Sequence, residues 1–511
     1  MLPSTSAARV YEGAAWAEPL ISPQTIGTHL RAAAQRYGDT CCLVEIDAMG
    51  REVARVGFRA LLRSVTGRAD QLRRDGAGRA SHIGVPVTNT IASVVDVLAV
   101  LESGAAAVIV DAAEPVGRRE EQFALLCGAI LDGTAADGPL RRNDPVLDDL
   151  GTDPYPTALV LFTTGSTAAS KPVAQSHYAV LVNVLATIRH HGMGPGQAMA
   201  CALPISHVNG LHFGVLATLL SGGTCLLFQR FDPLTYLRAL AAFGAQRATT
   251  VPSLLQSLGE LRRWPTLPDL RYVVSAAAPL SARTASLVYE RGHRVVQGYG
   301  LSECMNFATT MPTDVLGPEY EKYVLGARIP TVGHAVHGCE VAILGADGVP
   351  LGPGATGEVG IRGHSLMTGY LGDDTATEET LGSGWLRTGD IGRLEIAHPA
   401  RGPWLTLVGR QKNVAKCNGL SVSLEEIDRW LGEHPGVREA CAVARPDPHR
   451  GDAVTAYYVA AAVGAPTTDE LVAHVQLRLD GHTIGLQVRQ IDEIPRLRSG
   501  KINRRSLAAL L

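Results

Sequence analysis

Hydroxyl groups, a glycine and a lysine are concentrated in one short segment of this chain. Residues 163–171 read TTGSTAASK and follow an apolar run at residues 157–162. This pattern predicts a buried strand that leads into a flexible polar loop. Such a loop can offer backbone N–H groups, hydroxyl donors and one cation to a polyphosphate. The sequence therefore favours a phosphate-binding loop at residues 163–171.

Further segments place polar or charged side chains where strands and turns are expected to end. They are residues 204–207 (PISH), 297–303 (QGYGLSE), 384–390 (GWLRTGD), 409–413 (GRQKN) and 498–501 (RSGK). A lone tail lysine such as Lys501 is usually solvated, and a lone Glu303 or Asp390 could be an ordinary surface or turn residue. The fixed order of the whole set is far more specific than any one of its members.

In this order the segments resemble the adenylate-forming superfamily: acyl- and aryl-CoA ligases, luciferases and the adenylation domains of peptide synthetases. The resemblance covers the chain from roughly residue 30 to its end. Residues 204–210 and 303–306 look most similar to benzoate-type CoA ligases such as 4-chlorobenzoate–CoA ligase. The resemblance implies that a carboxylic acid attacks the α-phosphate of ATP, giving acyl-AMP and pyrophosphate, and that the acyl group then passes to CoA.

The resemblance also implies roles for single residues. Lys501 would bridge the substrate carboxylate and the α-phosphate, and Glu303 would bind Mg²⁺, a hard cation that prefers carboxylate oxygen. Asp390 would accept hydrogen bonds from the ribose. The implied catalytic residues are Lys501, Glu303 and His207. The implied nucleotide-binding residues are Thr163, Thr164, Gly165, Ser166, Thr167, Lys171, Tyr299, Ser302, Asp390 and Arg410.

The phosphate loop departs from the pattern usual in this superfamily. Thr164 replaces a serine, Ala168 replaces a glycine, Ser170 replaces a proline and Pro172 replaces a glycine. Alanine adopts positive φ less readily than glycine, so we expect a stiffer or differently bent loop. Lys171 and the hydroxyl groups remain, and ATP binding is still predicted.

Small and apolar residues dominate the implied acid pocket. Its residues are His207, Val208, Asn209, Ala276, Ala277, Ala278, Gly300, Met305 and Asn306, with His207 as the gate to the carboxylate. Residues 206–211 contain no carboxylate, whereas amino-acid-activating relatives carry an aspartate there to pair with the α-ammonium. An aryl or alicyclic acid is therefore expected, and Asn209 or Asn306 could satisfy a polar substituent on it.

The acceptor is less sharply defined than the acid activation. By resemblance Lys412 is the hinge, and Lys416 and Gly419 approach the active site, and hence CoA, in a second pose. Two alternatives remain: a stand-alone adenylating enzyme that passes the acyl group to an acyl-carrier protein or an amine, and a nucleotide-binding regulatory protein without turnover. The joint presence of Glu303, Asp390 and Lys501 argues against the second.

Length and composition exclude several other classes. A chain of 511 residues with 46% hydrophobic residues predicts at least two domains. A net charge of −3 gives no electrostatic case for nucleic acid. The nine cysteines form no C-x-x-C pair, and neither a secretory signal nor a membrane span is apparent, so a cytoplasmic protein is expected. The oligomeric state stays open, with a dimer among the possibilities.

The elements that must position these segments alternate between strand and helix from residue 80 onward. Asn89, for example, is expected to cap a helix that Gly104 ends. This alternation predicts an α/β class with parallel αβ-layered sheets. After residue 320, glycine-rich turns predict a small antiparallel β subdomain. We place a domain boundary at Gly409/Arg410, which divides residues 1–409 from a small mobile α+β domain at 410–511. Ser423 and Glu426 predict a capped helix in the latter.

Overall fold

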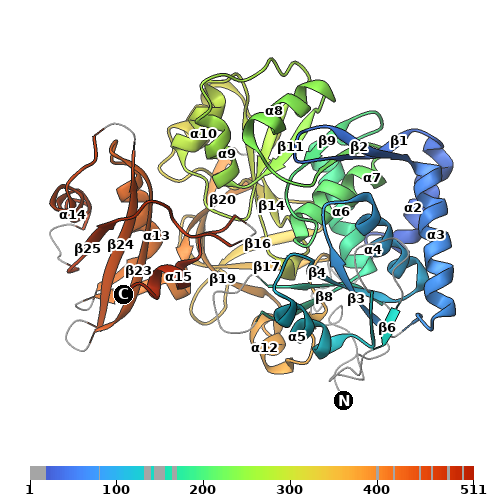
Figure 1. The fold of residues 1–511 in the computed structure, drawn as a ribbon. Coiled ribbons are helices and arrows are strands. Elements are labelled where there is room, and N and C mark those ends of the chain that lie inside the picture. The colour runs from blue at the N-terminus through green and yellow to red at the C-terminus, as the bar shows by residue number, and fades with distance from the viewer. Residues whose placement is uncertain are drawn as a thin grey trace.

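The computed structural model describes residues 19–22, 24–79, 81–131, 140–142, 156–163, 170–398, 402–417, 420–447, 451–461, 464–479, 484–497 and 500–511. Two large sheets with covering helices form the body of the molecule, and a third, C-terminal unit lies beside them (Figure 1). This arrangement confirms the predicted α/β class.

One of the large sheets has seven strands in the order β18-β8-β7-β4-β3-β5-β6. Its central strands β7, β4, β3 and β5 are parallel, and the outer strands pair antiparallel to their neighbours. The strands are β3 (His82–Val87), β4 (Ala106–Asp111), β5 (Ala129–Leu131), β6 (Leu140–Arg142), β7 (Thr157–Phe162), β8 (Pro172–Ser176) and β18 (Gly369–Tyr370).

The other large sheet has nine strands in the order β15-β14-β13-β12-β11-β9-β10-β1-β2, and its run from β13 to β1 is parallel. The strands are β1 (Cys41–Ile46), β2 (Glu52–Gly57), β9 (Ala198–Cys201), β10 (Thr224–Phe228), β11 (Arg247–Thr250), β12 (Tyr272–Ser275), β13 (Val295–Tyr299), β14 (Thr309–Thr310) and β15 (His334–Ala335).

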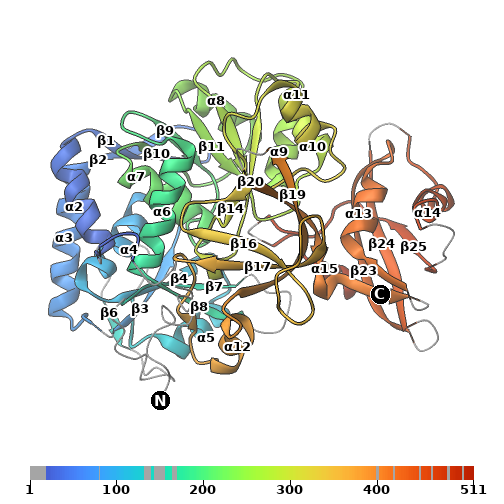
Figure 2. The ribbon, with the colours of Figure 1, turned by 180° about the vertical axis from the view of Figure 1, so that it is seen from behind.

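Helices cover both sheets, as Figures 1 and 2 show from opposite sides. They are α2 (Ile26–Tyr37), α3 (Phe58–Arg74), α4 (Ile91–Ser103), α5 (Val116–Leu126), α6 (His177–His191), the π-helix η2 (Asn209–Ala217), α7 (Thr218–Leu220), α8 (Pro233–Ala242), α9 (Pro252–Gly259), α10 (Ala282–Tyr289), the 3₁₀-helix η3 (Ser302–Cys304), α11 (Gly317–Tyr320), the π-helix η4 (Glu321–Leu325) and α12 (Asp374–Leu381).

The start of α4 corrects one sequence prediction. Thr90, not Asn89, caps the helix, since its side chain accepts a hydrogen bond from the backbone N–H of Ser93. The amide of Asn89 is buried and donates to the carbonyls of Leu203 and Phe228 instead. Asn89 therefore ties the end of β3 to the segments that follow β9 and end β10, and so links the two large sheets.

Four antiparallel strands form the predicted β subdomain in the order β16-β17-β19-β20. They are β16 (Cys339–Leu344), β17 (Thr356–Gly363), β19 (Leu386–His398) and β20 (Gly402–Arg410). Asp390 and Arg410 are direct partners on β19 and β20. The antiparallel pairing therefore places Arg410, the last residue of β20, opposite Asp390, which is predicted to bind the ribose of the nucleotide.

The C-terminal unit has its own five-stranded sheet and its own apolar core, which includes Ile427, Leu431 and Val437. Ser423 caps α13 by accepting a hydrogen bond from the backbone N–H of Glu426, as expected. The elements are η5 (Gln411–Asn413), β21 (Val414–Cys417), β22 (Leu420–Ser423), α13 (Leu424–Gly432), β23 (Val437–Asp447), β24 (Gly451–Ala460), α14 (Thr468–Gln476), β25 (Gln487–Gln490) and α15 (Arg504–Ala508).

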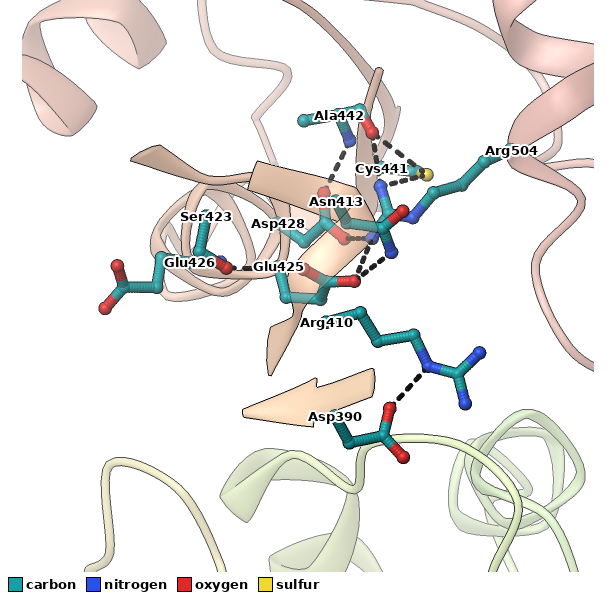
Figure 3. A network of polar contacts seen from close by, with 10 residues as sticks. All are labelled: Asp390, Arg410, Asn413, Ser423, Glu425, Glu426, Asp428, Cys441, Ala442 and Arg504. Atoms are coloured by element: carbon teal, nitrogen blue, oxygen red, sulfur yellow. Dashed lines mark hydrogen bonds and ion pairs between the residues drawn. The ribbon is translucent and has the colours of Figure 1, made fainter. Parts of the chain in front are cut away.

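A polar network connects the C-terminal helix α15 to α13 and to the start of the C-terminal unit (Figure 3). Arg504 forms an ion pair with Asp428 and lies 3.7 Å from Glu425, measured between Nη2 and Oε1. Glu425 in turn accepts a hydrogen bond from the side chain of Asn413 on η5. The helix that follows Lys501 is thereby fixed to the segment that follows Arg410. Among the described residues, none of the helices has the length and apolarity that a membrane crossing requires.

Candidate active site

The candidate nucleotide site is built around the buried carboxylate of Asp390. Arg410 Nε lies 2.7 Å from Asp390 Oδ1, and the Tyr299 hydroxyl donates a hydrogen bond of 2.7 Å to Asp390 Oδ2 (the ion pair is drawn in Figure 3). Burial raises the pKa of Tyr299, so its hydroxyl stays protonated and remains a donor. The nearby Asp390 carboxylate raises the pKa of Arg410. The carboxylate of Asp390 is thus held in place by a cation and a hydroxyl donor, and its oxygens can accept further hydrogen bonds from a sugar hydroxyl.

A second carboxylate, Glu303, lies on η3 immediately after β13. The Tyr370 hydroxyl donates a hydrogen bond of 2.8 Å to Glu303 Oε1, and burial raises the pKa of Tyr370. Lys171 Nζ lies 4.8 Å from the centre of the Tyr370 ring and 3.9 Å from Asp373 Oδ2. Lys171 at the end of the phosphate-loop segment and the predicted metal ligand Glu303 therefore contact the same tyrosine, Lys171 at the ring face and Glu303 at the hydroxyl group.

The surroundings of Glu303 fit magnesium better than a metal that needs a protein cage. No group of three or more His, Cys, Asp or Glu residues that could hold a metal ion occurs in the described part of the chain. Mg²⁺ commonly takes one or two carboxylates and completes its shell with substrate phosphates and water. Tyr370 occupies only part of the acceptor capacity of Glu303, so this carboxylate could serve as such a ligand.

The C-terminal unit brings Lys501 to the same place. Desolvation and the charge of Arg410 lower the pKa of Lys501 to about 8, while the carboxylates of Asp390 and Glu303 act in the opposite direction. Burial and the charge of Lys501 lower the pKa of His207 to about 4, so this histidine is neutral near pH 7. The ammonium group thus shares one electrostatic environment with Asp390, Glu303 and His207.

Gly500 allows this close approach. Its φ is +78°, and a Cβ added there would lie 2.8 Å from Val251 Cγ2 and 3.1 Å from Ser253 Oγ. Ser253 Oγ donates to the Gly500 carbonyl at 3.4 Å, and Arg496 donates to the same carbonyl at 2.9 Å. Only a residue without a side chain fits between this turn and the start of α9.

Two more contacts join the C-terminal unit to the body of the molecule. Arg283 on α10 donates a hydrogen bond of 3.0 Å to the backbone carbonyl of Val437 on β23. The guanidinium of Arg328 lies 5.8 Å from the centre of the Trp430 ring on α13. Together with the Gly500 turn, these contacts define the pose in which Lys501 faces Asp390 and Glu303.

The predicted acid-pocket residues lie at the ends of neighbouring parallel strands. Gly300 follows β13 and packs closely against the backbone of Asn306, since an added Cβ would lie 1.6 Å from the Asn306 carbonyl oxygen. Ala277 follows β12 with a φ of +70°, and Met305 follows η3 with a φ of +68°. Residues other than glycine rarely adopt a positive φ, and such backbone strain is concentrated at functional sites. Ala276 is buried, whereas Ala277 is exposed and Ala278 is partly exposed.

The pocket residues after His207 make side-chain contacts across this region. Asn209 Nδ2 lies 3.5 Å from Asn306 Oδ1, which joins the start of η2 to the segment after Glu303. Val208 precedes Asn209 and is partly exposed. Ser302 contributes its backbone carbonyl to a hydrogen bond of 2.6 Å from Gln175 on β8. The predicted pocket and the predicted metal ligand therefore adjoin one another.

The remaining predicted residues have mixed placements. Thr163 accepts a hydrogen bond from the backbone N–H of Lys171 through Oγ1 at 3.0 Å, and this contact closes the neck of the phosphate loop. Thr164, Gly165, Ser166, Thr167 and Gly419 lie outside the described residues. Desolvation and Arg410 lower the pKa of Lys412. Lys416 is exposed on β21, and its backbone N–H bonds to Asp452.

Sequence reasoning missed Tyr370 and His212. Tyr370 is 67 residues from Glu303, and no local pattern distinguishes it from an ordinary tyrosine. His212 is fully buried on η2 and bonds to Asn306. A signal for His212 was present, because a histidine interrupts an otherwise apolar helical stretch only five residues after His207.

Comparisons with known proteins give a consistent assignment. A family model described as AMP-binding enzyme matches residues 130–371, and a model described as AMP-binding enzyme C-terminal domain matches residues 426–501. A sulfoacetate–CoA ligase of Cupriavidus necator is 31% identical over 69% of this chain and 67% of its own. A 4-coumarate–CoA ligase 5 of Oryza sativa subsp. japonica is 30% identical over 75% of this chain and 70% of its own. A feruloyl-CoA synthase of an Amycolatopsis species is 29% identical over 75% of both chains.

Solved structures resemble nearly all of the chain. The amide bond synthetase McbA of Marinactinospora thermotolerans is 26% identical with a TM-score of 0.80, covering 95% of this chain and 99% of its own. ATP-bound MatB of Rhodopseudomonas palustris has the same TM-score at 21% identity, covering 95% of this chain and 99% of its own, a likeness of fold alone. These neighbours agree with the α/β architecture of a large N-terminal domain and a smaller C-terminal one.

Proposed function

We propose a function on the premise that this chain belongs to the AMP-binding enzyme family, as its family models and curated relatives establish. Membership confirms the predicted adenylate-forming superfamily. It also confirms the predicted enzyme class, an AMP-forming acid–thiol ligase of the acyl- or aryl-CoA type, and the predicted cofactors ATP, Mg²⁺ and CoA. Which acid is activated, which residues do it and where the acyl group goes are proposals.

In the proposed first step, an aryl or alicyclic carboxylate attacks the α-phosphorus of ATP through one oxygen. The bond from that phosphorus to the bridging oxygen of pyrophosphate breaks, so the products are acyl-AMP and pyrophosphate. Two anions must approach each other, and the site has to offset their repulsion. Lys501 supplies the mobile positive charge, and Asp390 and Arg410 hold the ribose side. Glu303 would hold Mg²⁺, whose positive charge would offset the negative charge of the departing pyrophosphate.

One observation carries this proposal. Lys501 comes from the C-terminal unit, and yet it shares its electrostatic environment with Asp390, Glu303 and His207 from the body of the molecule. An ammonium beside two carboxylates and a neutral histidine suits an anionic acid and a triphosphate that arrive together. A regulatory role without turnover would give no reason to bring Lys501 to this position.

An aromatic acid fits the small side chains that follow β12 and the turn at Gly300. Support comes from the feruloyl- and 4-coumarate-activating relatives, although the sulfoacetate–CoA ligase of Cupriavidus necator acts on a small acid. The finer resemblance to benzoate-type ligases such as 4-chlorobenzoate–CoA ligase stays part of the proposal. Residues 206–211 contain no carboxylate, so an α-amino acid remains disfavoured.

In the proposed second step, the CoA sulfur attacks the acyl carbonyl, the bond from that carbon to the AMP oxygen breaks, and the thiol proton is released. We propose Lys412 as the hinge of the domain movement, and Lys416 and Gly419 as residues that face CoA after it. An amine acceptor is the second candidate, favoured by the likeness to an amide bond synthetase over 95% of this chain.

Two further parts of the proposal concern organisation and location. We propose that residues 1–409 and 410–511 are the two domains, in keeping with the separate core of the C-terminal unit. We propose a cytoplasmic location, in keeping with nine cysteines of which none forms a disulfide within the described residues and eight are buried.

Acid-dependent ATP–pyrophosphate exchange tests the first step without any acceptor. A panel of benzoic, cinnamic and alicyclic acids should include members that support exchange, and Lys501→Ala should lower the exchange by about 10²-fold or more. Exchange by Lys501→Ala near the wild-type rate would refute the assigned role. Adding CoA or an amine to the accumulated adenylate then identifies the acceptor, since only the true acceptor discharges it.

A further inference from the structure

One tyrosine adjoins both the proposed metal ligand and the end of the proposed phosphate loop. Tyr370 lies on β18, which pairs antiparallel with β8 at the edge of the seven-stranded sheet. Its partner on β8 is Val173, and β8 begins immediately after Lys171. On the other side, the backbone N–H of Met367 donates a hydrogen bond of 2.7 Å to the backbone carbonyl of Glu303. Sheet pairing and this backbone bond together fix Tyr370 next to Lys171 and Glu303.

The hydroxyl of Tyr370 orients the carboxylate of Glu303. It donates to Glu303 Oε1 at 2.8 Å, and within the described residues the Glu303 side chain has no other hydrogen bond or ion pair. Tyr370 is buried, so its hydroxyl has little access to bulk water as an alternative partner. A hydrogen bond to one oxygen fixes the direction of the other, which is left to accept from a cation or a donor. Groups that orient a metal ligand in this way typically change metal affinity by about 10- to 100-fold.

The ring of Tyr370 lies under the ammonium group of Lys171. Lys171 Nζ is 4.8 Å from the ring centre, within the distance of about 6 Å over which a cation is attracted to an aromatic face. Asp373, which caps α12, adds an ion pair of 3.9 Å between its Oδ2 and the same nitrogen. The side chains of Lys171 and Asp373 are each 44% exposed, so this ion pair alone would restrain the lysine only weakly. The ring therefore gives the ammonium a defined position at the end of the phosphate loop.

We propose that Tyr370 is a positioning residue, which orients Glu303 toward Mg²⁺ through its hydroxyl and Lys171 toward the polyphosphate through its ring. This inference rests on the proposed function and adds to it a residue that acts through two other side chains. The two contacts can be separated chemically, because phenylalanine keeps the ring and lacks the hydroxyl. In the opposing interpretation the hydroxyl competes with the metal for Glu303, and its removal would then strengthen metal binding.

Binding of α,β-methylene-ATP, an analogue that cannot release pyrophosphate, measures both contacts without turnover. Calorimetry over a series of free Mg²⁺ concentrations gives the concentration at which the metal has half its full effect on affinity, and EDTA gives the metal-free affinity. Tyr370→Phe should raise the half-effect Mg²⁺ concentration about tenfold or more and leave the metal-free affinity within about twofold. Tyr370→Leu should show the same metal effect and also weaken the metal-free affinity about threefold or more, because Lys171 loses the ring.

Tyr299→Phe is the matched control, because it removes the other tyrosine hydroxyl that donates to a carboxylate of the site, that of Asp390. It should weaken binding of the analogue at every Mg²⁺ concentration and leave the half-effect concentration unchanged. Excess Mg²⁺ should restore ATP–pyrophosphate exchange to Tyr370→Phe and not to Tyr299→Phe.

Several outcomes would overturn the inference. An unchanged or lower half-effect Mg²⁺ concentration in Tyr370→Phe that is folded by circular dichroism would remove the role of the hydroxyl, and so would an equal shift in Tyr299→Phe. Equal metal-free affinities of Tyr370→Leu and Tyr370→Phe would remove the role of the ring. A wild-type enzyme that fails to bind the analogue, or binds it without any effect of Mg²⁺, would refute the proposed function and the inference with it.

Discussion

The lowered pKa of Lys501 predicts a specific pH dependence for acid activation. With a pKa of about 8, the ratio of ammonium to free amine is about ten to one at pH 7 and about one to ten at pH 9. If only the ammonium form assists the attack, kcat/KM for the acid should fall about tenfold per pH unit above pH 8. A lysine with its ordinary pKa of 10.5 would show no such fall below pH 10.

His207, Tyr299 and Tyr370 do not titrate in this range. The pKa of His207 is lowered to about 4, and the pKa values of Tyr299 and Tyr370 are raised. ATP–pyrophosphate exchange contains no thiol, so the ionisation of CoA does not enter. The anionic triphosphate should favour the ammonium once it is bound, and the fall in kcat should therefore begin at a higher pH than the fall in kcat/KM.

Lys501→Arg provides the decisive comparison. The guanidinium stays charged across the whole range, so this variant should be slower but should lose the alkaline fall. Circular dichroism at each pH would verify that both proteins remain folded. An alkaline fall of the same shape in wild-type and Lys501→Arg enzyme would refute the assignment of this titration to Lys501.

Three further predictions concern stability. Gly300→Ala should lower the free energy of unfolding by more than about 3 kcal/mol or prevent folding, because the added Cβ would lie 1.6 Å from a carbonyl oxygen. Gly194→Ala should be nearly neutral, because nothing lies within 4 Å of a Cβ added there. Urea unfolding measures both effects. Asn89→Ala should lower the free energy of unfolding by about 2–4 kcal/mol, since the Asn89 side chain satisfies three buried backbone groups. Thr90→Ala should lower it by only about 1 kcal/mol, through loss of the helix cap. Equal losses would contradict the observed capping. Arg504→Ala should cost about 2–4 kcal/mol by leaving two largely buried carboxylates of α13 without their cation, and an unchanged denaturation midpoint would contradict this.

Much of the fold could be predicted because local patterns and tertiary packing agree. The antiparallel β subdomain predicted after residue 320 is present as the sheet β16-β17-β19-β20, and Gly104 ends α4 with a φ of +96°, as expected. Asn89 shows where local reasoning ends. A polar residue just before an apolar helix is a good cap by its type, and no local pattern reveals that carbonyls 114 and 139 residues away would claim its side chain.

The candidate site shows the same division. Lys501, Glu303 and Asp390 could be grouped from the order of the motifs in the chain, because the family resemblance carries information about distant contacts. The contacts of Tyr370 with Glu303 and of His212 with Asn306 were missed, since each joins side chains from elements far apart in the chain. Pairwise contacts of this kind leave no periodic trace in a single sequence.

The close packing around Gly500 has a wider consequence. The turn at Gly500 packs against Val251 and Ser253, so larger side chains at these two positions would keep Lys501 away from the acid and the α-phosphate. The residues that bind the nucleotide would not move. Catalytic speed and affinity for ATP could then be varied independently through two residues that are not among the predicted nucleotide-binding or acid-pocket residues. Directed evolution at residues 251 and 253 would offer a control over turnover that leaves the choice of acid unaltered.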